Sequence, residues 1–152
     1  MLDELDRKIL QELQADARIS NAELARRVEL SPPATLVRIR RLEESGLIEG
    51  YTTRLNRSQA GYDLLCFVSV SLQVHNTDQL YAFRSAIREI PRVLECHHVT
   101  GDYDYLLKVV AKNTADLEDF LVNQLTPAPG VARIHTSVAL SETKPPSPLA
   151  LP

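Results

Sequence analysis

The hydrophobic residues of this chain change their spacing part-way along, and this change constrains the fold more than any other feature. Up to about residue 47 they recur at helical intervals, as Leu5, Ile9 and Leu13 illustrate. From Leu65 onward the period is 2. The apolar positions of that run are Cys66, Val68, Val70, Leu72 and Val74. Because a single type of element does not satisfy both periods, the sequence predicts a helical domain followed by a mixed one.

Capping signals divide the first fifty residues into three helices. The predicted signals are Asp3 and Ser31 as N-caps, a capping box formed by Ser20 and Glu23, prolines 32 and 33 in a first helical turn, and Gly46 as the C′ residue of the third helix. The second and third helices are separated by only the short turn Glu29-Leu30. This arrangement is typical of a helix-turn-helix.

The second half of the chain predicts the element order βαββαβ. The strand near residue 65 is followed by an amphipathic helix that ends at Pro91, by strands over 93–100 and 103–112, by a helix capped by Thr114, and by a strand over 131–140. Gly101-Asp102 joins the two middle strands as a hairpin turn. The order is that of a ferredoxin-like fold.

The predicted organisation is therefore α+β with four segments. Residues 1–50 form the helix-turn-helix (winged-helix-like) domain, residues 51–64 a linker strand with turns, residues 65–141 the ferredoxin-like domain, and residues 142–152 a proline-rich tail that lacks a packed element.

Composition narrows the class of protein. The net charge is −3, and no run of apolar residues is long enough to span a membrane. The N-terminus lacks the basic and hydrophobic regions of a secretory signal, so we expect a cytoplasmic protein. Cys66 and Cys96 lack metal-site spacing and are expected to be buried thiols. His97 and His98, adjacent on a strand, point to opposite faces and do not chelate one metal ion together. No cofactor is expected.

The third helix displays a face suited to a DNA major groove. Helical geometry predicts that Thr35, Leu36, Ile39 and Leu42 pack inward. The predicted DNA-contacting residues are Pro33, Ala34, Val37, Arg38, Arg40 and Arg41. Residues 26–41 contain five arginines and one acid, and the acids of the first helix are treated as distant and screened. The alternative is that the arginines are only a solvated surface.

Several phrases of the sequence resemble the Lrp/AsnC family of bacterial and archaeal transcription regulators. They are D-R-K-I-L, A-R-I-S-N-x-E-L-A, L-S-P and R-R-L-E-x-x-G-x-I-x-G-Y in the first half, and E-C-H-H-V-T-G-D-Y-D-Y-L-L-K-V in the second. The resemblance covers about residues 2–141. It implies that residues 32–41 form the recognition helix and that the second half is the family's effector-binding (RAM) domain. Val37 departs from the basic or polar residue of many members, which puts the operator sequence in doubt.

The same resemblance implies the partners. They are double-stranded DNA, a small amino-acid effector bound between dimers, and other copies of the chain in a homodimer and a higher oligomer such as an octamer. It also implies a place on the nucleoid.

The predicted effector-binding residues are His98, Gly101, Asp102, Tyr103, Asp104, Thr136 and Ser137. Gly101 and Asp102 are equally explained by turn geometry. Asp104 interrupts an apolar strand, so its carboxylate needs a partner, either the ammonium of a ligand or an arginine or backbone amide of the chain. His98 lies where the family more often has an aliphatic residue, and imidazole has a reference pKa of ~6.5, so we expect it to alter ligand preference or pH response.

The function expected from these observations is sequence-specific transcriptional regulation without catalysis. Two alternatives remain: a co-regulator that reaches DNA only through a heteromeric partner, and a tetrapyrrole-processing decarboxylase of similar fold. Replacement of Arg41 by alanine is expected to weaken DNA binding and to leave thermal stability unchanged.

Overall fold

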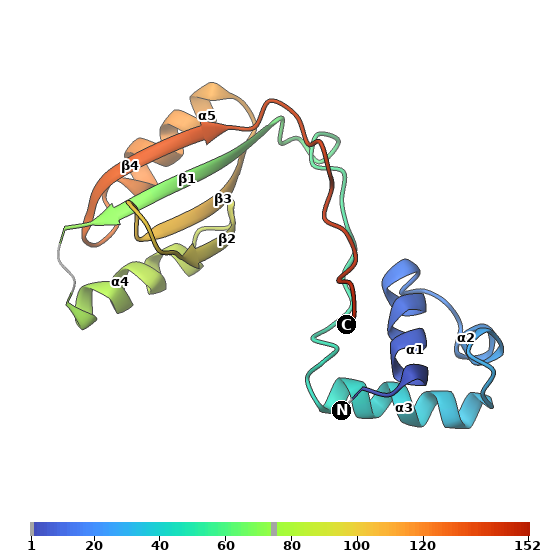
Figure 1. Cartoon of the computed structure of the whole chain (residues 1–152). Coiled ribbons are helices and arrows are strands. Elements are labelled where there is room, and N and C mark those ends of the chain that lie inside the picture. The colour runs from blue at the N-terminus through green and yellow to red at the C-terminus, as the bar shows by residue number, and fades with distance from the viewer. Residues whose placement is uncertain (1, 74–75) are drawn as a thin grey trace. The chain divides into compact units, whose positions relative to one another are not determined.

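The computed structural model describes residues 2–73 and 76–152 and separates into two compact units (Figure 1). The first, here called the helical unit, comprises Met1–Arg54 and Thr143–Pro152. The second, the sheet unit, comprises Leu55–Glu142. The predicted positions Val74 and His75 lie outside the described residues.

The helical unit contains α1 (Glu4–Ala15), α2 (Asn21–Arg27) and α3 (Pro32–Glu44). Their apolar faces meet in one small core. Its buried residues are Ile9, Leu10, Leu24, Val28 and Leu42. Because three short helices bury few residues each, their stability depends on this shared core and on their caps.

The predictions for Asp3, Ser31, the two prolines at the start of α3 and Gly46 are confirmed, and the capping box is confirmed only in part. The side chains of Asp3 and Ser31 accept hydrogen bonds from the backbone N–H groups of α1 and α3, and Gly46 follows α3 at a φ of +76°. Ser20 also caps α2, but the predicted return bond from Glu23 is absent from the described contacts, because that carboxylate binds two arginines instead.

The turn between α2 and α3 is tight because Glu29 adopts a left-handed conformation, with a φ of +58°. The Leu30 N–H then donates to the Ala25 carbonyl at 2.9 Å, which closes the end of α2. The turn fixes the direction in which α3 leaves α2 and thereby sets its exposed face.

The sheet unit has the predicted βαββαβ order. Its elements are β1 (Leu64–Leu72), α4 (Thr77–Arg88), β2 (Val93–His98), β3 (Tyr105–Ala111), α5 (Thr114–Asp119), which continues as the π-helix η1 (Phe120–Leu125), and β4 (Val131–Val138). The four strands form an antiparallel sheet in the order β2-β3-β1-β4, which is ferredoxin-like (Figure 1).

One face of this sheet is covered and the other is open. Both helices pack on the same face, where Phe83 of α4 and Phe120 of η1 are fully buried together with β1 residues such as Val68. On the opposite face Phe67 is 39% exposed. The outer strands β2 and β4 are mostly exposed as well.

Three local predictions in this half of the chain are wrong. No strand is assigned among residues 51–63, because an extended segment with no neighbour to bond does not form a ladder. Helix α5 is capped by Asn113, whose side chain accepts from the Asp116 N–H, rather than by Thr114. The β2–β3 connection spans residues 99–104, longer than the two-residue turn, and is closed by the Val99 N–H on the Asp104 carbonyl.

The two cysteines differ in their surroundings. Cys66 is buried as predicted, but Cys96 is exposed because it lies on the edge strand β2. Burial raises the pKa of the Cys66 thiol above its usual value, and the loss of part of its hydration does the same for Cys96.

Candidate DNA-binding surface and effector-side residues

Helix α3 presents an exposed face made of small, apolar and basic side chains. Pro33, Ala34, Val37 and Arg40 are all exposed, and Val37 is 67% accessible. Among the described residues, Arg40 has neither a hydrogen bond nor an ion pair at its guanidinium. Leu36, which was predicted to pack inward, is 38% exposed and widens this face.

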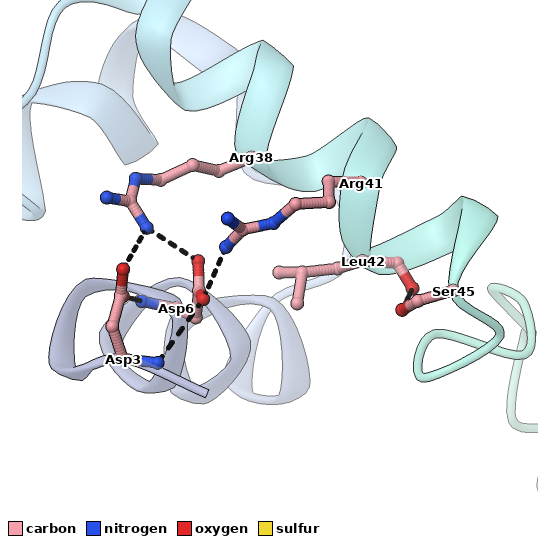
Figure 2. Close-up of polar contacts among 6 residues, drawn as sticks. All are labelled: Asp3, Asp6, Arg38, Arg41, Leu42 and Ser45. Carbon is pink, nitrogen blue, oxygen red and sulfur yellow. Dashed lines mark hydrogen bonds and ion pairs between the residues drawn. The ribbon is translucent and has the colours of Figure 1, made fainter. Parts of the chain in front are cut away.

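The other two predicted arginines of α3 are held by acids of α1 (Figure 2). The Arg38 guanidinium donates to Asp3 at 2.6 Å and to Asp6 at 2.8 Å, and Arg41 donates to the second oxygen of Asp6 at 2.5 Å. Asp6 is only 1% exposed, so this network lies at the buried contact between α1 and α3. Pairing with Asp3 and Asp6 raises the pKa of Arg38, and pairing with Arg38 lowers that of Asp3.

The arginines of α2 are also paired. The Glu23 carboxylate accepts two bonds from Arg26, at 2.7 and 2.9 Å, and one from Arg27 at 2.9 Å. Arg27 makes a further contact of 2.6 Å to Glu12 on α1. Four of the five arginines counted in residues 26–41 therefore have acidic partners within the helical unit.

This finding corrects the treatment of the α1 acids as distant and screened. Asp3, Asp6 and Glu12 touch the arginines directly, at contact distances far inside a Debye length of ~8 Å. The surface of α2 and α3 is therefore much less positive than the count of five arginines and one acid in residues 26–41 indicates. Arg40 is the arginine of α3 whose charge the described structure leaves available, and the predicted roles of Arg38 and Arg41 require them to leave or share Asp6.

The Glu23 cluster yields a prediction about pH. Hydrogen bonds from Arg26 and Arg27 lower the pKa of Glu23 from 4.5 to about 2. A depressed carboxylate pKa adds stability that is complete above the unfolded value and is lost as pH falls through the folded one. We expect denaturant midpoints to fall between pH 4.5 and about 2 more steeply in the wild-type chain than in Glu23→Gln. Parallel curves for the two chains would contradict the pairing.

Four of the predicted effector-binding residues, Gly101 to Asp104, lie in the 99–104 loop. The Asp102 carbonyl accepts from Arg133 of β4 at 3.1 Å and from the Ser71 hydroxyl of β1 at 3.4 Å. The Arg133 guanidinium also lies 4.7 Å from the centre of the Tyr103 ring. Gly101 has a φ of +114°, which explains glycine at that position by turn geometry. Sequence reasoning missed Arg133 and Ser71, since only strand register brings them beside the loop.

Asp104 is engaged within the chain. Its carboxylate accepts a bond of 2.8 Å from the Leu72 N–H at the end of β1, and its own N–H donates to the Val70 carbonyl. This matches the backbone-amide alternative for Asp104. By contrast, the Asp102 carboxylate has no bonded partner among the described residues.

The remaining predicted effector residues do not share one face. Thr136 lies opposite the buried Val68 on the helix-covered side, whereas Ser137 is exposed on the open side beside Phe67. His98 stacks on Tyr105 with ring centres 4.9 Å apart and lines a cavity of about 410 Å³ between α4 and β2, away from the open side.

Comparison with known proteins decides the family. Residues 65–149 match the family model described as the Lrp/AsnC ligand binding domain, and residues 2–49 match a winged helix-turn-helix DNA-binding model. The chain belongs to the Lrp/AsnC family. It is 43% identical over 143 residues to the leucine-responsive regulatory protein of Rhizobium meliloti, which covers 94% of this chain and 92% of that protein. The leucine-responsive regulatory protein of Escherichia coli K12 is also 43% identical, with 94% and 87% covered.

Solved structures of Lrp/AsnC proteins have the same fold. A transcriptional regulator from Neisseria meningitidis, solved as a complex with L-Met, superposes with a TM-score of 0.94 at 34% identity over 99% of this chain and 97% of that one. AsnC of E. coli gives 0.89 at 26% identity over 97% of each chain. The chain is thus a DNA-binding regulator with a ligand-binding domain and not an enzyme, which removes the decarboxylase alternative. None of the described helices is long and apolar enough to cross a membrane.

Proposed function

We propose that this Lrp/AsnC protein binds operator DNA through the exposed face of α3 and that a small amino acid modulates this binding. The carrying observation is the combination of Val37 and Arg40 on an uncovered helix face, because apolar side chains contact thymine methyl groups and arginine bonds guanine edges or phosphates. Pro33 and Ala34, at the first turn of the same helix, are small enough to permit close approach to the groove. Its place of action is the prokaryotic nucleoid.

Arg38 and Arg41 enter this proposal in a changed role. Their ion pairs with Asp6 position α3 against α1, so they act mainly by holding the exposed face of α3, here called the reading face, in place. Arg41 remains exposed enough to reach a phosphate if it leaves Asp6. The proposal therefore assigns direct contacts first to Arg40 and Val37.

The proposed effector site lies at the 101–104 loop. The Arg133 guanidinium would bind the α-carboxylate of the amino acid. The carboxylate of Asp102, which has no bonded partner among the described residues, would bind its α-ammonium group. The L-Met complex of the Neisseria relative and the names of the leucine-responsive relatives support L-Met and L-Leu as the first ligands to test. His98, Gly101, Tyr103, Asp104, Thr136 and Ser137 then act as surroundings of the ligand or as supports of the loop.

A thermal-shift measurement tests the effector site. Ligand that binds only the native state at 100 times its Kd adds about 2.7 kcal/mol of stability, which for a chain of this size raises Tm by roughly 5–10 °C. We expect such a rise with L-Met or L-Leu among the twenty amino acids, and none with the D-enantiomer. Asp102→Asn should keep the unliganded Tm and lose the rise. An undiminished rise in Asp102→Asn would contradict this site.

Assembly into homodimers and higher oligomers completes the proposal. The open sheet face, with Phe67 exposed, is an unpaired surface that a second copy of the chain covers. Two recognition helices on a dimer then read half-sites about one helical turn apart, or a multiple of it. Light scattering gives the mass directly, and a monomer at micromolar concentration would contradict the proposal.

A mobility shift with the purified chain alone, on the upstream region of its own gene, separates direct DNA binding from the co-regulator alternative. A shift that unlabelled specific duplex displaces supports direct binding. If a shift appears only when a second protein is added, the co-regulator alternative is correct.

A further inference from the structure

The last residues of the chain lie against α1 and residues 47–54 of the helical unit. Leu149 and Leu151 form one wall of a groove of about 530 Å³, and the other walls include Leu10, Leu13 and Ile48. None of the residues that line the groove belongs to α3. In Figure 1 the C-terminal trace ends beside α1.

Specific hydrogen bonds hold the tail there. The Gln14 side-chain amide donates to the Leu149 carbonyl at 3.1 Å and accepts from the Leu149 N–H at 2.7 Å, so one amide satisfies both backbone groups of one residue as a neighbouring strand would. Arg54 donates to the Pro146 carbonyl at 3.2 Å. The tail is thus bound through its backbone at two points.

One tail side chain adds apolar contact. Leu151 is partly buried against the core of the helical unit, whose members include Ile9 and Leu10, whereas the Leu149 side chain is 76% exposed. Leu151 therefore anchors the tail, and Leu149 contributes mainly its backbone. The exposed Leu140, between β4 and the tail, is 99% accessible and provides a matched control.

The composition of the tail lowers the entropic cost of this binding. Residues 145, 146, 148 and 152 are prolines, which fix φ before binding and lack an N–H that would need a partner. A segment that already favours an extended conformation loses less freedom when it docks. The same prolines prevent the tail from forming an independent helix.

We propose that residues 146–151 are an intramolecular ligand of the helical unit, which docks against α1 and residues 47–54 and leaves the face of α3 free. The tail follows β4 in the sequence and belongs to the helical unit. This docking does not rest on the proposed regulatory function.

Amide hydrogen exchange on the full chain tests the docking independently of DNA. The Leu149 N–H should exchange about tenfold more slowly than in a random coil, as one maintained hydrogen bond implies. Gln14→Ala and Leu151→Asp should each remove this protection, and Leu140→Asp should not. Leu149 exchange at the random-coil rate in the wild-type chain would overturn the proposal.

A chain that ends at Glu142 provides the complementary experiment. We expect faster exchange of the Leu47 and Ile48 amides, which form the wall of the groove, and recovery when a synthetic peptide of residues 143–152 is added. Unchanged exchange on truncation would overturn the docking. Protection of Leu149 that disappears on dilution to the monomer would show that the tail of another copy docks on the helical unit, and would overturn the intramolecular assignment.

Discussion

Asp6→Ala is expected to destabilise the helical unit by about 2–4 kcal/mol, because removing one member of a buried ion network leaves charge without its partner. Asp6 is 1% exposed and bonds both Arg38 and Arg41. We expect a loss of unfolding free energy near the lower end of this range, because both arginines remain partly exposed to water. Urea denaturation of the purified chain, followed by circular dichroism, measures the change.

A charge-matched variant separates this effect from the general loss of an acid. Glu4 lies in the same turn of α1 and is exposed, so Glu4→Gln should change stability by less than about 0.5 kcal/mol. The cost of Asp6→Ala should also be smaller when Arg38 is already replaced by methionine, because the two side chains are coupled. Equal losses for the Asp6 and Glu4 variants would contradict a structural role of the network.

Arg40→Ala is expected to weaken specific DNA binding about 10- to 100-fold, the loss of one arginine contact to a base or of its phosphate equivalent. Arg40 is exposed on α3 and has no ionic partner among the described residues, so the free energy of unfolding should stay within about 0.5 kcal/mol of the wild-type value. Fluorescence anisotropy on a labelled operator and urea denaturation together test both statements.

Two controls make this variant decisive. Arg18→Ala removes the same charge at an exposed position outside α3 and should change affinity only slightly. Arg41→Ala, which sequence reasoning proposed as the clean probe, should lower stability as well, because it takes a partner from the buried Asp6. Wild-type affinity in Arg40→Ala would contradict the assignment of the reading face.

The helix boundaries could be predicted because their causes are local. The caps Asp3 and Ser31 bond amides three residues away, and Gly46 is suited by itself to the backbone conformation that ends α3. Cap signals of this kind lie within one helical turn. The period-2 pattern that located β1 is also local, because it lies within a single strand.

The ion pairs of the α3 arginines could not be predicted from such local signals. Arg38 and Asp3 are 35 residues apart, and only the packing of α3 against α1 brings their side chains together. A helical wheel shows in which direction each side chain of α3 points. It contains no information about acids on another helix, such as Asp6 on α1. The exposure of Leu36, at 38%, likewise depends on how the helices pack and does not follow from the helical wheel.

The effector side shows a similar division. Gly101 has the positive φ that its residue type predicts, although the connection around it is longer than two residues. The sequence predicted that the Asp104 carboxylate needs a partner but left open whether a ligand or a group of the chain supplies it, and one partner is the Leu72 N–H. Arg133 was missed because its approach to Asp102 depends on the register between β1 and β4. Thr136 and Ser137 lie on opposite faces of the sheet because neighbouring residues of a strand alternate in direction, and this could have been predicted from the sequence.

The central claim is that this chain alone recognises a DNA sequence through α3, and selection from a random duplex pool tests it most directly. The account predicts enrichment of a sequence with two related half-sites whose centres lie about 10–10.5 base pairs apart or a multiple of that. In a parallel selection, Arg40→Ala should relax the preference at one position of each half-site. No enrichment by the purified wild-type chain, or identical motifs from the two chains, would contradict the account.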